Sequence, residues 1–191
     1  IFTAPILIVT LVILVQVFGA FQLLELRFLD KLFEFRNAES LDPKIVVITF
    51  DDDDIAKIGK WPFSDAVVAN LITTVKLGNP RVMGLDVYRN LPIEPGFEEL
   101  KRVFNSSPNL IVAEKFVNPS VPPPPYIDYE KQVGFVDTVV DLDGTVRRGL
   151  LSIEKPNGEL LYSFSIKIAL KYLGSNNIFP QLPSGNDLTV S

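Results

Sequence analysis

The hydrophobic pattern of the chain changes at about residue 25. Residues 1–24 contain no charged side chain and consist mainly of Leu, Ile, Val and Phe. Because a helix rises about 1.5 Å per residue, a stretch of this length can cross the ~30 Å hydrocarbon core of a bilayer. The pattern therefore predicts one transmembrane helix over residues 1–24. A signal peptide is the alternative interpretation, but its apolar region is normally only about 7–15 residues long.

Helical spacing continues beyond the apolar segment. Leu26, Leu29, Leu32 and Phe33 fall on one helical face. The spacing predicts a juxtamembrane helix followed by a linker, together covering residues 25–40. Such a helix either transmits movement between a membrane and a domain or packs against the side of the domain.

Short apolar runs then alternate with helical patterns. Residues 45–50, IVVITF, lack the alternation of a half-exposed strand, which is typical of a strand buried on both faces of a parallel sheet. A helix that begins after Ser64 and a second apolar run over residues 81–87 follow. Strand, helix and strand in this order predict a βαβ unit with two parallel strands.

The alternation continues toward the end of the chain. We predict a helix over residues 97–104, a third strand over residues 110–113 and a closing helix over residues 164–173. Between the last two, residues 133–137 and 145–153 flank an Asp-Gly pair, which is a strong turn signal. This pattern predicts a β-hairpin.

These elements together predict an α/β fold. We expect a three-layer α/β/α sandwich with a largely parallel central sheet and a C-terminal β-hairpin, preceded by one transmembrane helix. The domain is expected over residues 41–175, and residues 176–191 are expected to form a polar linker to a continuation of the chain. Residues 118–126, NPSVPPPPY, form either a stiff surface loop or a polyproline ligand for a partner, because proline lacks the backbone donor of a helix or central strand.

Composition and charge exclude several functional classes. The net charge is −5 and no long basic run occurs, so the footprint of a nucleic-acid-binding protein is missing. The chain has no Cys and no His, which excludes disulfides, the usual zinc sites and imidazole-based catalytic triads. It also lacks glycine-rich nucleotide-binding loops and the common hydrolase motifs. We therefore predict no enzymatic activity, no cofactor and no metal.

Acidic side chains follow both strands of the predicted βαβ unit. Asp51 and Asp52 open a run of four acids after the first strand, and Asp86 lies near the end of the second. The carboxyl ends of parallel strands meet at one edge of a sheet, where ligands of open α/β folds bind. Four consecutive acids cannot all face one cation, so helix capping and solvation are the alternative to a cation site.

Two further features complete the candidate site. Trp61 and Phe63 stand beside Pro62 and form either an aromatic plug over the sheet or the wall of a ligand pocket. Arg147 lies on the second arm of the predicted hairpin, where it pairs with an acid or faces an anionic ligand. The predicted ligand or signalling pocket consists of Asp51, Asp52, Trp61, Phe63, Asp86 and Arg147.

Several ordered blocks resemble the CHASE2 family of extracellular sensor domains. They are ITFDDDDIAKIGKWPF, GLDVY, VGFVD, DLDGTVRRGLLSI and FSIKIALKYL. The apolar span and the LRFLDKLFEFR helix after it also resemble the segment that introduces this domain, so the resemblance covers about residues 24–173. Positions that match the family pattern are Asp51, Gly59, Trp61, Pro62, Gly84, Asp86, Asp143, Gly144 and Arg147. Two positions depart from it, since Phe63 replaces the usual second Trp and Asp65 stands where the family commonly has Arg. If that Arg pairs with the acidic cluster in relatives, this chain must balance the same charge differently.

The resemblance implies the extracytoplasmic sensory input domain of a bacterial, cyanobacterial-type transmembrane receptor. Residues 25–191 would lie outside the cell membrane in a homodimer. An unknown small-molecule or physical signal would pass to an intracellular output module of the same chain, a nucleotide cyclase, a histidine kinase or a Ser/Thr kinase. Two alternatives are a membrane-anchored dimerisation or docking scaffold that senses nothing, and a metal-assisted hydrolase built on the acidic run.

Overall fold

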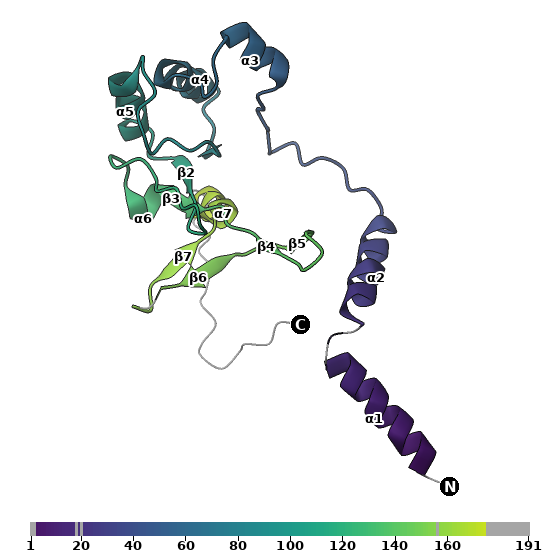
Figure 1. Cartoon of the computed structure of the whole chain (residues 1–191). Helices are drawn as coiled ribbons and strands as arrows, with labels where there is room; N and C mark the ends of the chain where they lie inside the picture. Colours follow the sequence, from purple (N-terminus) through teal and green to yellow (C-terminus); the bar gives the residue numbers. More distant parts are fainter. Residues whose placement is uncertain (1–2, 18, 20, 156, 175–191) are drawn as a thin grey trace. The chain divides into compact units, whose positions relative to one another are not determined.

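The computed structural model describes residues 3–17, 19, 21–155 and 157–174. The chain divides into an N-terminal unit, Ile1–Thr49, and a sheet unit, Phe50–Ser191 (Figure 1). The helices are α1 (Thr3–Val17), α2 (Gln22–Glu34), α3 (Asp52–Ile58), α4 (Asp65–Leu77), α5 (Phe97–Asn105), α6 (Tyr129–Gln132) and α7 (Phe164–Gly174). The strands are β1 (Met83–Leu85), β2 (Leu110–Glu114), β3 (Val133–Phe135), β4 (Val139–Val140), β5 (Val146–Arg148), β6 (Ser152–Glu154) and β7 (Leu160–Tyr162).

The N-terminal unit contains two helices followed by a coil. α1 ends at Val17 and α2 begins at Gln22, whereas the sequence pattern predicts one helix that continues from residues 1–24 into the juxtamembrane segment. Gly19, between the two helices, has a φ of 72°, and this left-handed conformation ends α-helical geometry. The predicted juxtamembrane helix, which begins the segment 25–40, is present as the larger part of α2, which ends at Glu34.

Among the described residues, no helix is both long enough and apolar enough to cross a membrane. The membrane crossing of residues 1–24 stays a prediction.

Residues 45–50 form no strand in the described chain. The exposed fraction is 70% at Ile45 and 82% at Val46, so these side chains are not in a core. The predicted first strand is therefore wrong. β-branched residues favour a pleated, half-buried surface, but a strand also needs a neighbour that satisfies its backbone N–H and C=O groups.

The sheet unit is built on a parallel sheet in the order β1-β2-β3. Met83 of β1 pairs with Leu110 of β2, and Val112 of β2 pairs with Val133 of β3. Every residue of β2 is buried, as expected for a central strand that is covered on both faces. The second and third predicted strands are thus confirmed, and the first βαβ unit consists of β1, α5 and β2.

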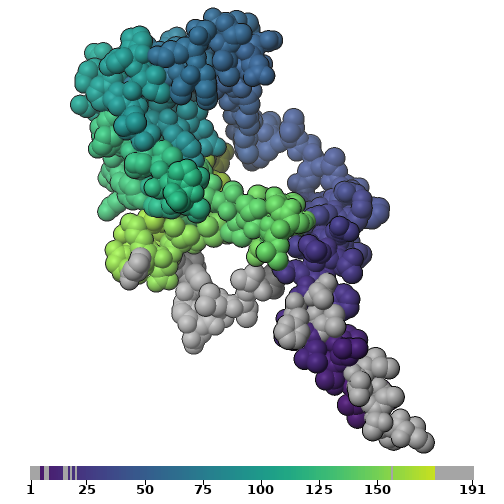
Figure 2. Space-filling view, in the orientation of Figure 1, coloured from purple at the N-terminus to yellow at the C-terminus, as the bar shows by residue number. Residues whose placement is uncertain are grey.

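Helices α4 and α5 cover one face of this sheet. Val68 of α4 and Leu100 and Phe104 of α5 share one buried cluster with Met83 and Leu85 of β1. In the space-filling view, the teal surface of α5 continues into the green surface of the segment that follows β2 (Figure 2). The helices predicted after Ser64 and over residues 97–104 are confirmed.

Helix α7 covers the opposite face, where two glycines allow a close approach. A Cβ atom at Gly84 would lie 2.6 Å from Ile168 Cδ1, and one at Gly134 would lie 2.6 Å from Phe164 Cα. A larger residue at Gly134 would meet the backbone of α7, whereas one at Gly84 would displace the ends of the Ile168 and Phe164 side chains. The order α4 and α5, sheet, α7 agrees with the predicted three layers, and α7 confirms the predicted closing helix (Figure 1).

Two hairpins follow the parallel sheet instead of the single hairpin that the pattern predicts. β4 pairs with β5 around the Asp-Gly turn, and β6 pairs with β7. The predicted first arm, residues 133–137, begins with β3, which belongs to the parallel sheet. The predicted second arm, residues 145–153, is divided between β5 and β6. All three residues of β3 are buried beside β2, and this burial outweighs pairing with the nearest segment along the chain.

The Pro-rich segment is attached to the domain. Lys115 and Val121 exchange two backbone hydrogen bonds of 2.9 Å, and Pro124 is buried. The rings of Tyr126 and Phe97 lie 5.7 Å apart. These contacts favour the interpretation of residues 118–126 as a stiff loop. The predicted polar linker over residues 176–191 lies outside the described residues.

Candidate functional site

The acidic run begins helix α3. The Asp51 carboxylate accepts a hydrogen bond of 2.9 Å from the backbone N–H of Asp54, and the Asp54 carboxylate accepts one of 3.4 Å from the backbone N–H of Asp51. This reciprocal capping satisfies two donors at the start of the helix. Asp52 and Asp53 lie in the first turn, where negative charge interacts favourably with the helix dipole. Capping thus accounts for the acidic run locally.

Asp86 follows β1 and is exposed. Among the described residues, no group of three His, Cys, Asp or Glu side chains is arranged to hold a metal ion. The expectation that Asp51, Asp52 and Asp86 gather at one edge required the strand over residues 45–50, which is not formed.

The aromatic pair divides into a buried and an exposed member. Phe63 is 0% exposed, and its ring lies 4.7 Å from Phe50 and 4.9 Å from Trp61, measured between centroids. Both contacts are edge-to-face, the arrangement that aromatic quadrupoles favour. Trp61 is 53% exposed. Phe63 therefore acts as the core plug, and Trp61 covers it from the solvent side.

Directly after Phe63, an ion pair is buried. Asp65 is 1% exposed and Arg89 is 3% exposed, and Arg89 Nη1 lies 3.4 Å from Asp65 Oδ1. Arg89 Nη1 also donates to the Phe63 carbonyl at 2.7 Å, and the backbone N–H of Ile93 donates to Asp65 Oδ2 at 3.0 Å. Asp65 at the start of α4 is thus tied to the segment after β1.

The surroundings of this ion pair are poorly solvated. Burial lowers the pKa of Arg89, and the charge of Asp65 opposes this effect. Burial, together with the negative charge of Asp65, raises the pKa of Tyr126 to about 12. Among the described residues, Arg89 Nε and Nη2 have no hydrogen-bond acceptor, and each unsatisfied buried donor costs about 1–3 kcal/mol. The unsatisfied donors of Arg89 therefore reduce the stability of the folded protein, and the surrounding packing holds the ion pair in place.

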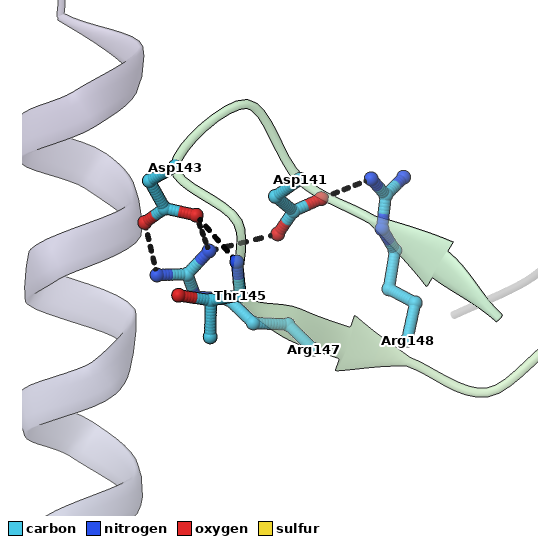
Figure 3. A network of polar contacts seen from close by, with 5 residues as sticks. All are labelled: Asp141, Asp143, Thr145, Arg147 and Arg148. Carbon is cyan, nitrogen blue, oxygen red and sulfur yellow. Dashed lines mark hydrogen bonds and ion pairs between the residues drawn. The ribbon is translucent and has the colours of Figure 1, made fainter.

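A second charged network lies on the β4–β5 hairpin (Figure 3). Arg147 donates to both carboxylate oxygens of Asp143, with distances of 2.9 Å and 2.6 Å, and Nη1 also lies 2.9 Å from Asp141 Oδ2. Arg148 approaches the other oxygen of Asp141. The two parallel bonds between Arg147 and Asp143 form a bidentate pair, the strongest common geometry for these groups.

The turn that connects the strands is part of the same network. The backbone N–H of Thr145 donates to Asp143 Oδ1 at 3.2 Å, and Gly144 has a φ of 82°. The hydrogen bonds from Arg147 hold the pKa of Asp143 well below its usual range. Hydrogen bonds from Arg147 and then Arg148 lower the pKa of Asp141. The Arg147 side chain is 4% exposed, so this network positions it firmly.

A third polar contact fastens β2 to α6. Tyr129 Oη donates to Glu114 Oε1 at 2.8 Å, and Glu114 is 5% exposed. Burial raises the pKa of Glu114, while the hydrogen bond from Tyr129 lowers it.

Another carboxylate binds the segment that follows β2. Asp137, just after β3, accepts hydrogen bonds from the backbone N–H groups of Phe116 and Val117 at 2.8 Å and 2.7 Å.

The predicted pocket residues thus lie in four different settings, one of which is the exposed position of Asp86 after β1. Asp51 and Asp52 begin α3, Trp61 and Phe63 form the aromatic plug, and Arg147 belongs to the hairpin network. The structure links Trp61 with Phe63 directly, and it links Arg147 with acidic side chains as one alternative predicted. Their role as a single ligand pocket stays a prediction.

Sequence reasoning missed Arg89. One signal was present, because an acid at position 65, where the family commonly has Arg, requires a compensating cation elsewhere. The position of that cation depends on the packing of the segment after β1 against the start of α4. Local pattern contains no information about this contact.

Comparisons with known proteins place the chain in a family. Searches of curated proteins and of solved structures each found no match. The family model for the CHASE2 domain matches residues 7–190. Since this match covers nearly the whole chain, including most of α1, the hairpin network and α7, the protein belongs to the CHASE2 family.

Proposed function

We propose that this chain is the extracytoplasmic sensory input domain of a bacterial transmembrane signalling receptor. CHASE2 domains are sensory domains of signalling receptors. The observation that carries the proposal is the extent of the family match, which runs from residue 7 through the sheet unit. Most of the apolar α1, from residue 7 onward, is therefore part of the family pattern.

The side chains of α1 support membrane anchoring. Val9 and Leu11 are each 57% exposed, and Val17 is 75% exposed. A contiguous apolar surface of this kind is unfavourable in water and is relieved in a hydrocarbon environment. In the proposal, residues 1–24 anchor the chain in the cell membrane and residues 25–191 lie on its outer side.

The polar groups of the sheet unit favour recognition over catalysis. Asp65 and Arg89 bind each other, and Arg147 is engaged by Asp141 and Asp143. Groups held in this way are poor proton donors or nucleophiles, because general acid–base catalysis needs a pKa near the working pH. A metal-assisted hydrolase is accordingly the weaker alternative.

Signalling requires that a stimulus distinguish two states of the receptor. In the proposal, two copies of the chain form a homodimer, and a small-molecule or physical signal shifts the equilibrium of the sheet unit. The shift passes through the N-terminal unit to an intracellular output module of the same polypeptide, a cyclase, a histidine kinase or a Ser/Thr kinase.

Residues 1–191 contain no cysteine, so single-cysteine labelling tests the topology directly once any cysteine elsewhere in the receptor has been replaced. Leu142, 83% exposed, and Leu77, 84% exposed, are suitable positions for single cysteines in the full-length receptor. We expect a membrane-impermeant maleimide to label Leu142→Cys and Leu77→Cys in intact cells from which the outer envelope has been removed. Lysed cells provide the control for intrinsic reactivity of each thiol.

The two compartments give opposite results in this experiment. Labelling of both positions before lysis supports an extracytoplasmic sheet unit. Labelling of both only after lysis would place the domain inside the cell and overturn the proposal. Fractionation of the same cells tests the anchor, since recovery of the full chain in the soluble fraction would contradict it.

A further inference from the structure

Helix α2 carries an apolar stripe that the rest of the described chain leaves uncovered. Its members, here called the Phe28 stripe, are Leu24, Phe28, Leu32 and Phe35. Phe35 is the C-cap of α2 and keeps helical backbone angles. All four side chains are more than half exposed, with 67% at Phe28 and 82% at Phe35. Because residues three or four apart lie on one side of a helix, the stripe is a continuous apolar surface.

The opposite side of α2 is charged. Arg27, Asp30, Lys31 and Glu34 follow the same spacing on that side, and Lys31 Nζ lies 2.6 Å from Glu34 Oε2. The helix contains two cations and three acids, the third acid being Glu25 in the first turn. A helix with Leu and Phe on one side and charges on the other can lie in the plane of a membrane interface, with its apolar side toward the acyl chains.

The stripe begins close to the proposed membrane anchor. α1 ends at Val17 and α2 begins at Gln22, so the connection between them spans at most about 18 Å. Gly19 in this connection has a φ of 72°, a left-handed conformation that ends α-helical geometry. α2 is therefore not a straight continuation of α1, and its axis can follow the surface of a membrane that α1 enters.

The Phe28 stripe does not suit a coiled coil with a second copy of the chain. The seam of a coiled coil advances alternately by three and four residues. A seam through Phe28 includes either Lys31 or Glu25, depending on the register, and a charge at a seam position lowers stability. Another side of α2 offers a seam without charge, formed by Leu26, Leu29 and Phe33. Two paired copies would use that seam and leave the Phe28 stripe uncovered.

We propose that the Phe28 stripe inserts into the lipid–water interface on the outer side of the membrane, so that α2 lies along the membrane surface. Arg27 and Lys31 keep their charged groups in water while their aliphatic stems cover apolar surface. Because acids outnumber cations on α2, this contact does not depend on anionic lipids. The inference rests on the membrane anchor of the proposed function and adds a second contact between the chain and the bilayer.

Spin labelling of the full chain in phosphatidylcholine nanodiscs tests this placement. Residues 1–191 contain no cysteine, so a single nitroxide can be attached at Phe28→Cys or Leu32→Cys. Arg27→Cys, on the charged side of the same helix, is the matched control, and Leu11→Cys in α1 reports on the anchor. Paramagnetic resonance measures how often each label collides with oxygen, which concentrates in lipid, and with a nickel chelate, which stays in water.

We expect the ratio of oxygen to nickel collisions to be severalfold higher at Phe28 and Leu32 than at Arg27. Equal ratios at these three positions, with an oxygen-rich ratio at Leu11, would overturn the interfacial placement and leave the anchor intact. Low collision rates with both reagents at Phe28 would mean that protein covers the stripe, and magnetic broadening between labels would identify a second copy as that protein. A nickel-rich ratio at Leu11 would refute the anchor, and the interfacial placement with it.

Discussion

Asp65 and Arg89 face each other in the core of the sheet unit, with Arg89 Nη1 3.4 Å from Asp65 Oδ1 and both side chains 1% exposed. The pair connects the first turn of α4 to the segment after β1. It thereby joins two elements that are separate in the sequence.

Arg89→Met should destabilise the protein by about 3–5 kcal/mol, because it leaves the Asp65 carboxylate buried without a counter-charge. The double variant Asp65→Asn with Arg89→Met should recover most of this loss, since Asn still offers an acceptor to Ile93. Urea unfolding followed by Trp61 fluorescence measures both. Arg102→Met, at an exposed position of α5, is the control and should change stability by less than about 0.5 kcal/mol. A similar loss in the double variant would contradict this account.

Gly134→Ala should destabilise by about 1–3 kcal/mol, because its Cβ would lie 2.6 Å from Phe164 Cα and 2.8 Å from Phe164 N. Gly84→Ala should cost less, since its closest contacts are the tips of the Ile168 and Phe164 side chains, which can rotate. Gly149→Ala meets nothing within 4 Å and should be neutral. Thermal unfolding of the three variants tests this order, and equal melting temperatures would refute the close packing of α7.

The hairpin network should show a characteristic dependence on pH. Arg147 lowers the pKa of Asp141 and Asp143 below the ordinary value of 3.8. A depressed pKa in the folded state means that the stabilisation is complete above the ordinary pKa and is lost as the pH falls through the folded value. We therefore expect the stability contributed by Arg147 to be constant near neutral pH and to decrease below about pH 4. The melting temperatures of the wild type and of Arg147→Gln, measured across this range, should become equal at low pH. A difference in melting temperature that does not change with pH would count against the network.

Phe63→Ala should cost about 3–5 kcal/mol, as expected when a fully buried aromatic ring is removed. Trp61→Ala should cost clearly less, because Trp61 is 53% exposed. Urea unfolding followed by circular dichroism compares the two without relying on the tryptophan. A larger loss for Trp61→Ala would mean that the exposed ring, and not Phe63, closes the core.

The comparison of Ile45 with Leu110 shows that the local sequence pattern does not decide by itself whether an apolar run forms a strand. Both begin β-branched apolar runs, and both runs have the composition of buried strands. Leu110 is 1% exposed in a central strand, whereas Ile45 is 70% exposed in a coil. Pairing between segments distant in the chain decides which run becomes a strand, and composition does not encode that pairing.

The sequence by itself determined the α/β class, the helices α4, α5 and α7, the strands β1 and β2, and the Asp-Gly turn of the hairpin. It also contained the family pattern, because ordered motifs such as GLDVY and DLDGTVRRG are local strings. Helical periodicity, capping and turn chemistry act over a few residues and are therefore readable along the chain.

Tertiary structure alone decided the partner of Asp65, the parallel pairing of β3 and the second hairpin. It also brought Arg81 and Lys131 close to Lys167 and Lys171 of α7. Each of these depends on contacts between segments separated by twenty residues or more, or on competition between alternative strand partners. Such contacts are selected by burial and charge in the assembled core, so only the folded chain reveals them.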